Sequence, residues 1–276
     1  MEVLVRWSQA VKTSTASSSV GHLKGALDVV LGLVIFCIAW QLVFWAKVYP
    51  PYLLPSPAAV LDRLVAMAQS GQLGLGIEVT LGRLLAGFSI SVLLGLGVGL
   101  AMVNFSRFGR VMNSFSLGLQ SFPSIAWVPF AILLVGLNDL GIVFVMVVAS
   151  VFSMMASTYA ALRNIPPIYV KAARNMGTKG LALFTGVLLP ASLPSLVTGL
   201  RQAWSFAWHA LVGAEILMAT VGLGALLEFG AEFVRMDQII ASMITIFAIG
   251  LVADRLVFSV VEERVRSSRG LTTQTR

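Results

Sequence analysis

Residues 165–190 read IPPIYVKAARNMGTKGLALFTGVLLP and stand between two long apolar runs, Leu140–Leu162 and Pro194–Ala219. A plain connection between two packed helices takes only about 2–8 residues. This segment is several times longer than that and carries helix signals of its own. We therefore expect it to be a structural element rather than a loop.

The signals within this segment predict two short helices. Pro166 and Pro167 suit the first turn of a helix, because the N–H group that proline lacks would have no partner there. Gly177 suits a left-handed residue that ends the helix. Thr178 can cap a second helix, Lys179–Leu189, which we expect to end at the following proline. Together they predict two helices joined by a glycine elbow.

The composition around this segment is that of a membrane protein. The chain has 276 residues, of which 58% are apolar and only 11% are charged. Soluble chains are nearer to about 45–50% apolar and about 25% charged. A soluble enzyme, a coiled coil and a disordered chain are therefore excluded. The single cysteine, Cys37, excludes an internal disulfide and a thiolate metal site, and we expect it to be a buried, inert thiol.

A helix that crosses a bilayer needs about 20 mostly apolar residues. Six runs meet this requirement, and we predict an all-α polytopic fold with six transmembrane helices. They are Leu27–Ala46, Leu81–Val103, Val111–Gly136, Leu140–Leu162, Pro194–Ala219 and Ile239–Val261. The third run is interrupted by Pro123 and Pro129. We place a cytoplasmic tail at 1–25, the transmembrane domain at 26–264 with 165–190 inside it, and a second cytoplasmic tail at 265–276.

The basic residues predict which ends of the spans lie inside the cell. Cytoplasmic loops carry an excess of Lys and Arg. With the N-terminus inside, 13 of the 19 basic residues fall in inner segments, three in outer segments and three within spans. We therefore expect both termini to be cytoplasmic. The net charge of +7 is interpreted as basic inner loops, not as a nucleic-acid site.

Small residues recur at helical spacing within two of the predicted spans. Gly95 and Gly99 form a GxxxG pair, and Ala149, Ser153 and Ser157 recur every four residues. Such spacings allow membrane helices to approach closely. We expect these residues to lie at helix contacts.

The segment 165–190 resembles the signature of ABC importer permeases, E-A-A-x3-G-x9-I-x-L-P. The matching residues are Lys171, Ala172, Ala173, Gly177, Val187, Leu189 and Pro190, and every spacing fits. Lys171 replaces the glutamate and Val187 replaces the isoleucine. The resemblance implies that this segment is a cytoplasmic coupling helix that docks on an ATPase, with Arg174 among its contact residues.

Other stretches resemble the nitrate, sulfonate and taurine branch of these permeases. They include TLGRLLAGF at Thr80–Phe88, FPSIAWVPFAILLVG at Phe122–Gly136, LPSLVTGLRQAWSFAW at Leu193–Trp208 and GLG at Gly222–Gly224. The resemblance implies a type I ABC importer permease fold in the bacterial inner membrane. It also implies a second permease copy in a homodimer, two ATPase subunits and an extracytoplasmic solute-binding protein. The transported solute would be a small anion such as an aliphatic sulfonate, taurine or nitrate.

The chain carries no motif for catalysis. It has no G-x4-G-K-[ST] phosphate loop, so we expect no directly bound cofactor and ATP hydrolysis in a separate subunit. His22 and His209 are its only histidines, and no metal site or catalytic triad is evident around them. We therefore expect a non-enzymatic subunit.

Two polar helix faces are candidates for the translocation path. In the fifth span the candidates are Arg201, Ser205, Trp208, His209 and Glu215; in the third span they are Gln120 and Ser124. Intramembrane charges are costly and point to function. Arg201 suits an anion, because a guanidinium binds oxyanions through a planar fork. The alternative is that Arg201 pairs with an acid at a helix contact and that the other polar groups seal helix contacts.

Two other functions remain open at this point. A secondary transporter or channel without an ATPase partner would favour inverted repeats and paired intramembrane acids. A structural membrane scaffold would need no transport path.

Overall fold

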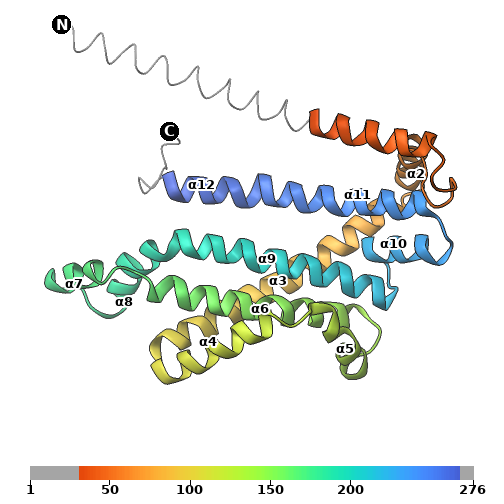
Figure 1. The fold of residues 1–276 in the computed structure, drawn as a ribbon. Coiled ribbons are helices and arrows are strands. Elements are labelled where there is room, and N and C mark those ends of the chain that lie inside the picture. Colours follow the sequence, from red (N-terminus) through yellow and green to blue (C-terminus); the bar gives the residue numbers. More distant parts are fainter. Residues whose placement is uncertain (1–30, 268–276) are drawn as a thin grey trace, which may run out of the picture. The chain divides into compact units, whose positions relative to one another are not determined.

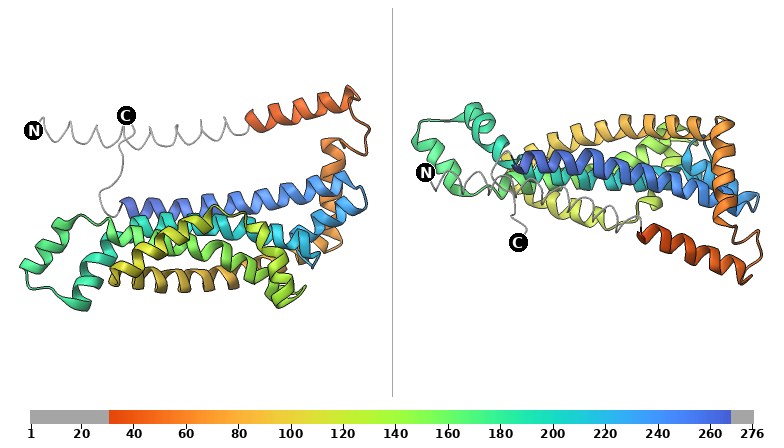
Figure 2. Two further views of the ribbon diagram at one scale, coloured as in Figure 1. Left: turned by 60° about the horizontal axis from the view of Figure 1, so that its bottom comes forward. Right: turned by 90° about the horizontal axis from the view of Figure 1, so that it is seen from above.

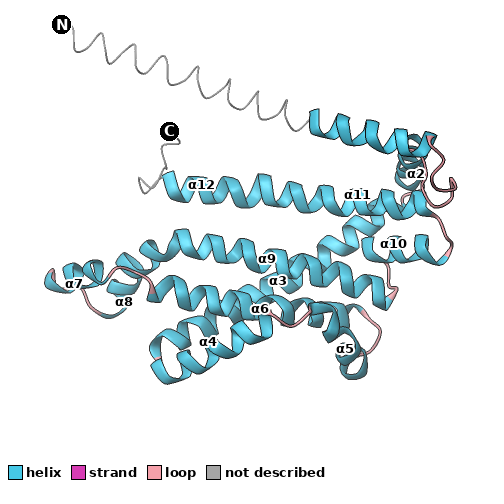
Figure 3. Ribbon diagram, viewed as in Figure 1, coloured by secondary structure: helices cyan, strands magenta, loops and turns pink. Residues whose placement is uncertain are grey.

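The computed structural model describes residues 31–267, and within them every regular element is a helix (Figures 1 and 3). The predicted tail 1–25 lies outside the described residues, as do residues 27–30 of the first predicted span and 268–276 of the second tail. The chain forms two compact units, 1–62 and 63–276.

The first unit contains the helix Leu31–Trp45, whose indole at Trp40 donates to the carbonyl oxygen of Pro55 at 3.0 Å. Cys37 is exposed on this helix, so the expectation of a buried thiol was wrong. The helix α2, Pro57–Gln69, runs from the end of this unit into the second one.

The second unit holds the remaining helices. In chain order they are α3 (Gln72–Asn104), α4 (Ser106–Gln120), the 3₁₀ turn η1 (Ser124–Trp127), α5 (Val128–Val135), α6 (Asp139–Arg163), α7 (Pro167–Asn175), α8 (Gly180–Leu183), the π-helix η2 (Phe184–Leu188), α9 (Leu189–Met218), α10 (Leu223–Glu232), α11 (Met236–Val252), the π-helix η3 (Ala253–Phe258) and α12 (Ser259–Ser267). Within residues 31–267, four helical stretches are long and apolar enough to cross a membrane: Gln72–Asn104, Asp139–Arg163, Gly180–Met218 and Met236–Ser267.

The core lies where α6 packs between α3 and α9. A Cβ added at Gly95 would lie 2.5 Å from the Cβ of Met154, and one at Gly99 would lie 2.5 Å from the Cβ of Thr158. On the other side of α6, a Cβ at Gly199 would lie 2.5 Å from the Cβ of Ser157. The close approach of these helices depends on small residues, as expected for Gly95, Gly99 and Ser157.

The third predicted span, Val111–Gly136, is not one straight helix. It is divided into α4 and the pair η1–α5, which are bent by 99° relative to each other. The break falls at Ser121–Pro123, where the missing N–H of proline and its effect on the preceding residue stop α4. Only together are the two parts long and apolar enough to cross a membrane, as a broken span or as a re-entrant loop.

The second helix of the segment 165–190 does not end at Pro190. Thr178 does not cap it; α8 continues through the π-helix η2 into α9, so that one helical stretch runs from Gly180 to Met218. Inside an α-helix, proline clashes with the carbonyl four residues earlier. For Pro190 that residue is Gly186, which lies in the wider π turn, and this accounts for the uninterrupted helix.

The bundle of the second unit has two distinct ends (Figures 1 and 2). The helices α7 and α8 lie at one end, together with the C-terminal end of α12. The helices α5 and α10 lie at the opposite end. The segments that carry the predicted inner charges of Lys171, Arg174 and Arg264 are therefore gathered at one end, away from α5 and α10.

Candidate translocation path and coupling segment

The helix α9 exposes a polar face along its middle turns. Gln202, Ser205 and His209 are exposed and recur at helical spacing on this face. The helix belongs to an apolar stretch long enough to span a membrane. Exposed polar side chains at this depth need a water-filled space or a polar partner.

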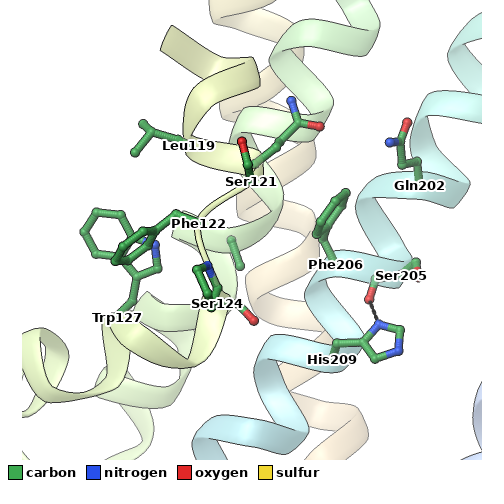
Figure 4. A pocket seen from close by; sticks show the side chains of 12 residues that line it. Leu119, Ser121, Phe122, Ser124, Trp127, Gln202, Ser205, Phe206 and His209 are labelled. Carbon is green, nitrogen blue, oxygen red and sulfur yellow. Dashed lines mark hydrogen bonds between the residues drawn. The ribbon is translucent and has the colours of Figure 1, made fainter.

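One cavity, of about 520 Å³, lies between this face and the break in the third span. It brings together four predicted path residues, Gln120, Ser124, Ser205 and His209. Figure 4 shows Ser124 on the broken segment and Ser205 and His209 on α9, with the ring of Phe206 between the two walls. The break in the third span thus supplies one wall of this cavity.

A second cavity, of about 610 Å³, lies on the other side of the same face. Arg201 and Trp208, two further predicted path residues, line it together with the shared residues Gln202, Ser205 and His209. Trp208 is largely buried, because its indole packs against Gly250 of α11.

Arg201 forms ion pairs and does not face the cavity as a free cation. Its Nε and Nη2 donate to the two carboxylate oxygens of Asp254, each at 2.6 Å, and its Nη1 donates to Glu262 at 3.2 Å. The pair with Asp254 is the bidentate fork that guanidinium and carboxylate groups favour. Of the two roles considered from the sequence, the structure therefore has Arg201 paired with an acid at a helix contact.

Glu215 lies outside both cavities, and its side chain is fully buried. Its carboxylate accepts from Arg83 at 2.8 Å, from the hydroxyl of Thr80 at 2.9 Å and from the N–H of Gly224 at 3.0 Å. Arg83 also donates to Asp139 and to the carbonyl oxygen of Val221, each at 2.6 Å. We call Thr80, Arg83, Asp139 and Glu215 the outer network.

The outer network was not predicted from the sequence. The signal available was a pair of opposite charges, Arg83 and Glu215, each inside an apolar run. What the sequence could not supply was the contact between the N-terminal half of α3 and the C-terminal half of α9, which makes these two residues partners. The network also explains the glycines of the GLG motif, because a Cβ at Gly222 would lie 2.5 Å from the Glu215 carboxylate and one at Gly224 would lie 2.6 Å from its Cβ.

The segment 165–190 forms a projecting elbow made of α7 and α8. Gly177 has φ +85°, the left-handed conformation predicted for the helix end. Ala173 is buried and its carbonyl oxygen accepts from the N–H of Thr178, which closes the elbow. Lys171, Ala172 and Arg174 are exposed along α7, whereas Leu189 and Pro190 begin α9.

The elbow also exposes large apolar side chains. Ile168, Met176 and Leu181 are 65%, 79% and 77% exposed. Apolar side chains beside cationic ones, on a projecting element, are typical of a surface that binds another protein. The geometry therefore fits a docking element at one end of a membrane bundle.

A bundle of membrane-spanning helices, a polar cavity wall within it and a docking elbow at one end define a helical membrane transport subunit. The family model described as "Binding-protein-dependent transport system inner membrane component" matches residues 91–267. The chain belongs to this family, and it is a permease component of an ABC importer. A secondary transporter, a channel and a structural scaffold are not supported.

Relatives with curated names agree with this assignment. An ABC transporter permease protein of Methanocaldococcus jannaschii is 31% identical over 224 residues, which cover 79% of this chain and 83% of that protein. SsuC of Escherichia coli (strain K12), named for aliphatic sulfonates transport, is 32% identical over 216 residues, covering 78% and 82% of the two chains.

A solved structure shares the fold. The MetNI methionine ABC transporter, in an inward-facing conformation, contains a chain that matches with a TM-score of 0.56 at 20% identity. The match covers 75% of this chain and 99% of that one. The predicted all-α, type I ABC importer permease fold is therefore confirmed.

Proposed function

We propose that two copies of this chain enclose a path for a small anion such as an aliphatic sulfonate, taurine or nitrate. The observation that carries this proposal is the exposed polar face of α9, with Gln202, Ser205 and His209 beside two cavities. A second copy facing α9 would cover these side chains and leave a polar channel between the two faces. The name of SsuC supports a sulfonate, whose oxygens accept hydrogen bonds from such groups.

The elbow of α7 and α8 is the proposed docking site for an ATPase subunit, one on each copy. Its exposed cations, Lys171, Arg174 and Lys179, would meet an acidic rim. Its apolar side chains would fill the cleft within that rim. The permease itself would bind no cofactor, and ATP would be hydrolysed in the partner subunit.

The different contents of the two ends of the bundle support an orientation in the membrane. In this proposal the elbow end faces the cytoplasm, and both termini of the chain are cytoplasmic. The end with α5 and α10 faces outward and receives an extracytoplasmic solute-binding protein.

Uptake by reconstituted vesicles tests the proposal. Vesicles containing the permease, its ATPase and its binding protein should accumulate labelled ethanesulfonate only when ATP is supplied, with taurine, nitrate and bicarbonate as competitors. Gly177→Val should reduce uptake severalfold, because a β-branched residue in the left-handed conformation costs about 1–2 kcal/mol and distorts the elbow.

Gly186→Val is the matched control, since a Cβ at Gly186 meets nothing within 4 Å and its φ is not positive. It should retain most of the uptake. Equal uptake by both variants would remove the coupling role of the elbow. If ATP drives no uptake of any of the four anions by the wild type, the proposed function is wrong.

A further inference from the structure

The ion pair of Arg201 and Asp254 forms part of the wall of the second cavity, whose volume is about 610 Å³. The two side chains are 40% and 38% exposed, whereas a pair that only joined two helices would be covered by them. Asp254 belongs to the π-helix η3, and short π segments within α-helices are frequent at functional sites. A solute in the cavity can therefore reach both charges of the pair.

Both members of the pair retain capacity for further hydrogen bonds. A guanidinium has five N–H groups, and Arg201 uses two of them for Asp254 and one for Glu262. Among the described contacts two N–H groups are left, one on Nη1 and one on Nη2. An ionised carboxylate has about four lone-pair sites, and Arg201 occupies two of those on Asp254. The pair can thus donate to an anionic group and accept from a cationic group at the same time.

The formal charges around this cavity sum to zero. Among the described residues that line it, only Arg201 and Asp254 are charged when His209 is neutral. Behind them Glu262 pairs with Arg201 at 3.2 Å and with Arg266 at 3.0 Å, so the ion-paired cluster contains two cations and two anions. A solute with a negative charge alone meets no net positive charge here. A zwitterion finds a partner for each of its charges.

Two indole rings add to the part of the wall that suits a cation. Trp204 and Trp208 line the same cavity. The ring of Trp204 is held by Phe88 and Phe258, whose ring centroids lie 5.3 Å and 5.4 Å from its own. An ammonium group is attracted to the face of an indole. Indoles beside a carboxylate with unused lone pairs therefore favour an ammonium group.

We infer that this cavity binds a small zwitterion, in which a short chain joins an ammonium group to a sulfonate as in taurine, in preference to the plain anion. The sulfonate accepts from the two remaining N–H groups of Arg201, and the ammonium group donates to Asp254. Glu262, which does not line the cavity, holds Arg201 in position. This inference rests on the proposed function and names the class of solute that the path accepts.

Taurine and ethanesulfonate test this inference, because they share the sulfonate and the two-carbon chain and only taurine carries an ammonium group. Equilibrium dialysis of each labelled compound against the solubilised complex of permease and ATPase gives two dissociation constants. The binding protein is left out, so that its own selectivity does not enter the measurement. We expect taurine to bind at least about tenfold more tightly, because its ammonium group adds a charge-assisted hydrogen bond.

Three variants separate solute binding from a structural role. Asp254→Asn should abolish or invert the preference for taurine, because the ammonium group loses its anionic partner while Arg201 gains capacity for the sulfonate. Arg201→Lys keeps the charge but loses the fork, so both compounds should bind severalfold more weakly. Glu263→Gln removes an exposed negative charge outside the cavity on the same helical stretch, and it should keep the wild-type preference.

Equal binding of the two compounds by the wild type, or tighter binding of ethanesulfonate, overturns the inference. This comparison needs no variant, so it decides the inference even if a variant fails to fold. A wild-type preference in Asp254→Asn also overturns it, because Asp254 would then not contact the ammonium group. Failure of both compounds to bind overturns it as well. In each of these cases ATP-driven uptake of a small anion would leave the proposed function intact.

Discussion

At the scale of single residues, the most constrained group is the Glu215 carboxylate. It is fully buried and accepts hydrogen bonds from α3 and from the N–H of Gly224 in α10. Removing one partner of a buried ion pair leaves an uncompensated charge, at a cost of about 3–5 kcal/mol. The outer network thus ties α3 and α9 to the start of α10.

A double-mutant cycle measures this connection. Arg83→Met and Glu215→Leu should each destabilise the solubilised permease by about 3–5 kcal/mol. The double variant should be destabilised by less than the sum of the two single effects. The difference, which is the coupling energy of the pair, should be about 0.5–3 kcal/mol. The readout is unfolding of the detergent-solubilised protein.

The control is Arg63→Met, which removes the partly exposed pair between Arg63 and Asp237 at 2.7 Å. Such pairs contribute at most about 1 kcal/mol. The role given to the outer network would be contradicted if the two single losses of stability simply added up in the double variant. It would also be contradicted if Arg63→Met destabilised the protein as much as Arg83→Met.

At the scale of helices, packing of α3 on α6 depends on a small-residue stripe. Gly95→Ala would place a Cβ 2.5 Å from the Cβ of Met154, a contact that backbone movement alone can relieve. Overpacking of this kind costs about 1–3 kcal/mol. Unfolding of the detergent-solubilised protein should detect this loss of stability.

Gly97→Ala provides a control on the same helix, because a Cβ there meets nothing within 4 Å. It should be neutral or slightly stabilising, since alanine favours a helix more than glycine does. Equal losses at the two positions would mean that helix propensity, and not packing, explains the effect of Gly95.

Some features of the helices could be predicted from the sequence and others could not. Apolar runs and the signature spacing predicted the helical class, the elbow at Gly177 and the contacts of Gly95 and Gly99, because each depends on local chemistry. The bend at Pro123 was visible only as a proline, since its angle depends on what packs around it. The continuous helix through Pro190 could not be predicted, because a π turn leaves no signature of its own.

At the scale of the whole molecule, the sequence predicted a polar path and left open whether Arg201 lines it or pairs with an acid, and in the structure Arg201 is paired. Four path candidates do meet in one cavity, whereas Arg201 is paired and Glu215 is buried in the outer network. Both differences have the same cause. A helical face is readable from spacing, but which helix that face meets depends on the packing of distant segments such as α3 and η3.

The claim that the polar face of α9 lines a water-filled path can be tested by thiol labelling. In a Cys37→Ser background, Ser205→Cys is compared with Leu93→Cys on α3, whose side chain is 71% exposed and apolar. A charged, membrane-impermeant thiol reagent is applied to the assembled transporter in vesicles, from each side in turn. We predict rapid labelling of Ser205→Cys that ethanesulfonate and its binding protein slow, and no labelling of Leu93→Cys, which we expect to face lipid. Failure of Ser205→Cys to react from either side, or equal reaction at the two positions, would contradict a path along α9.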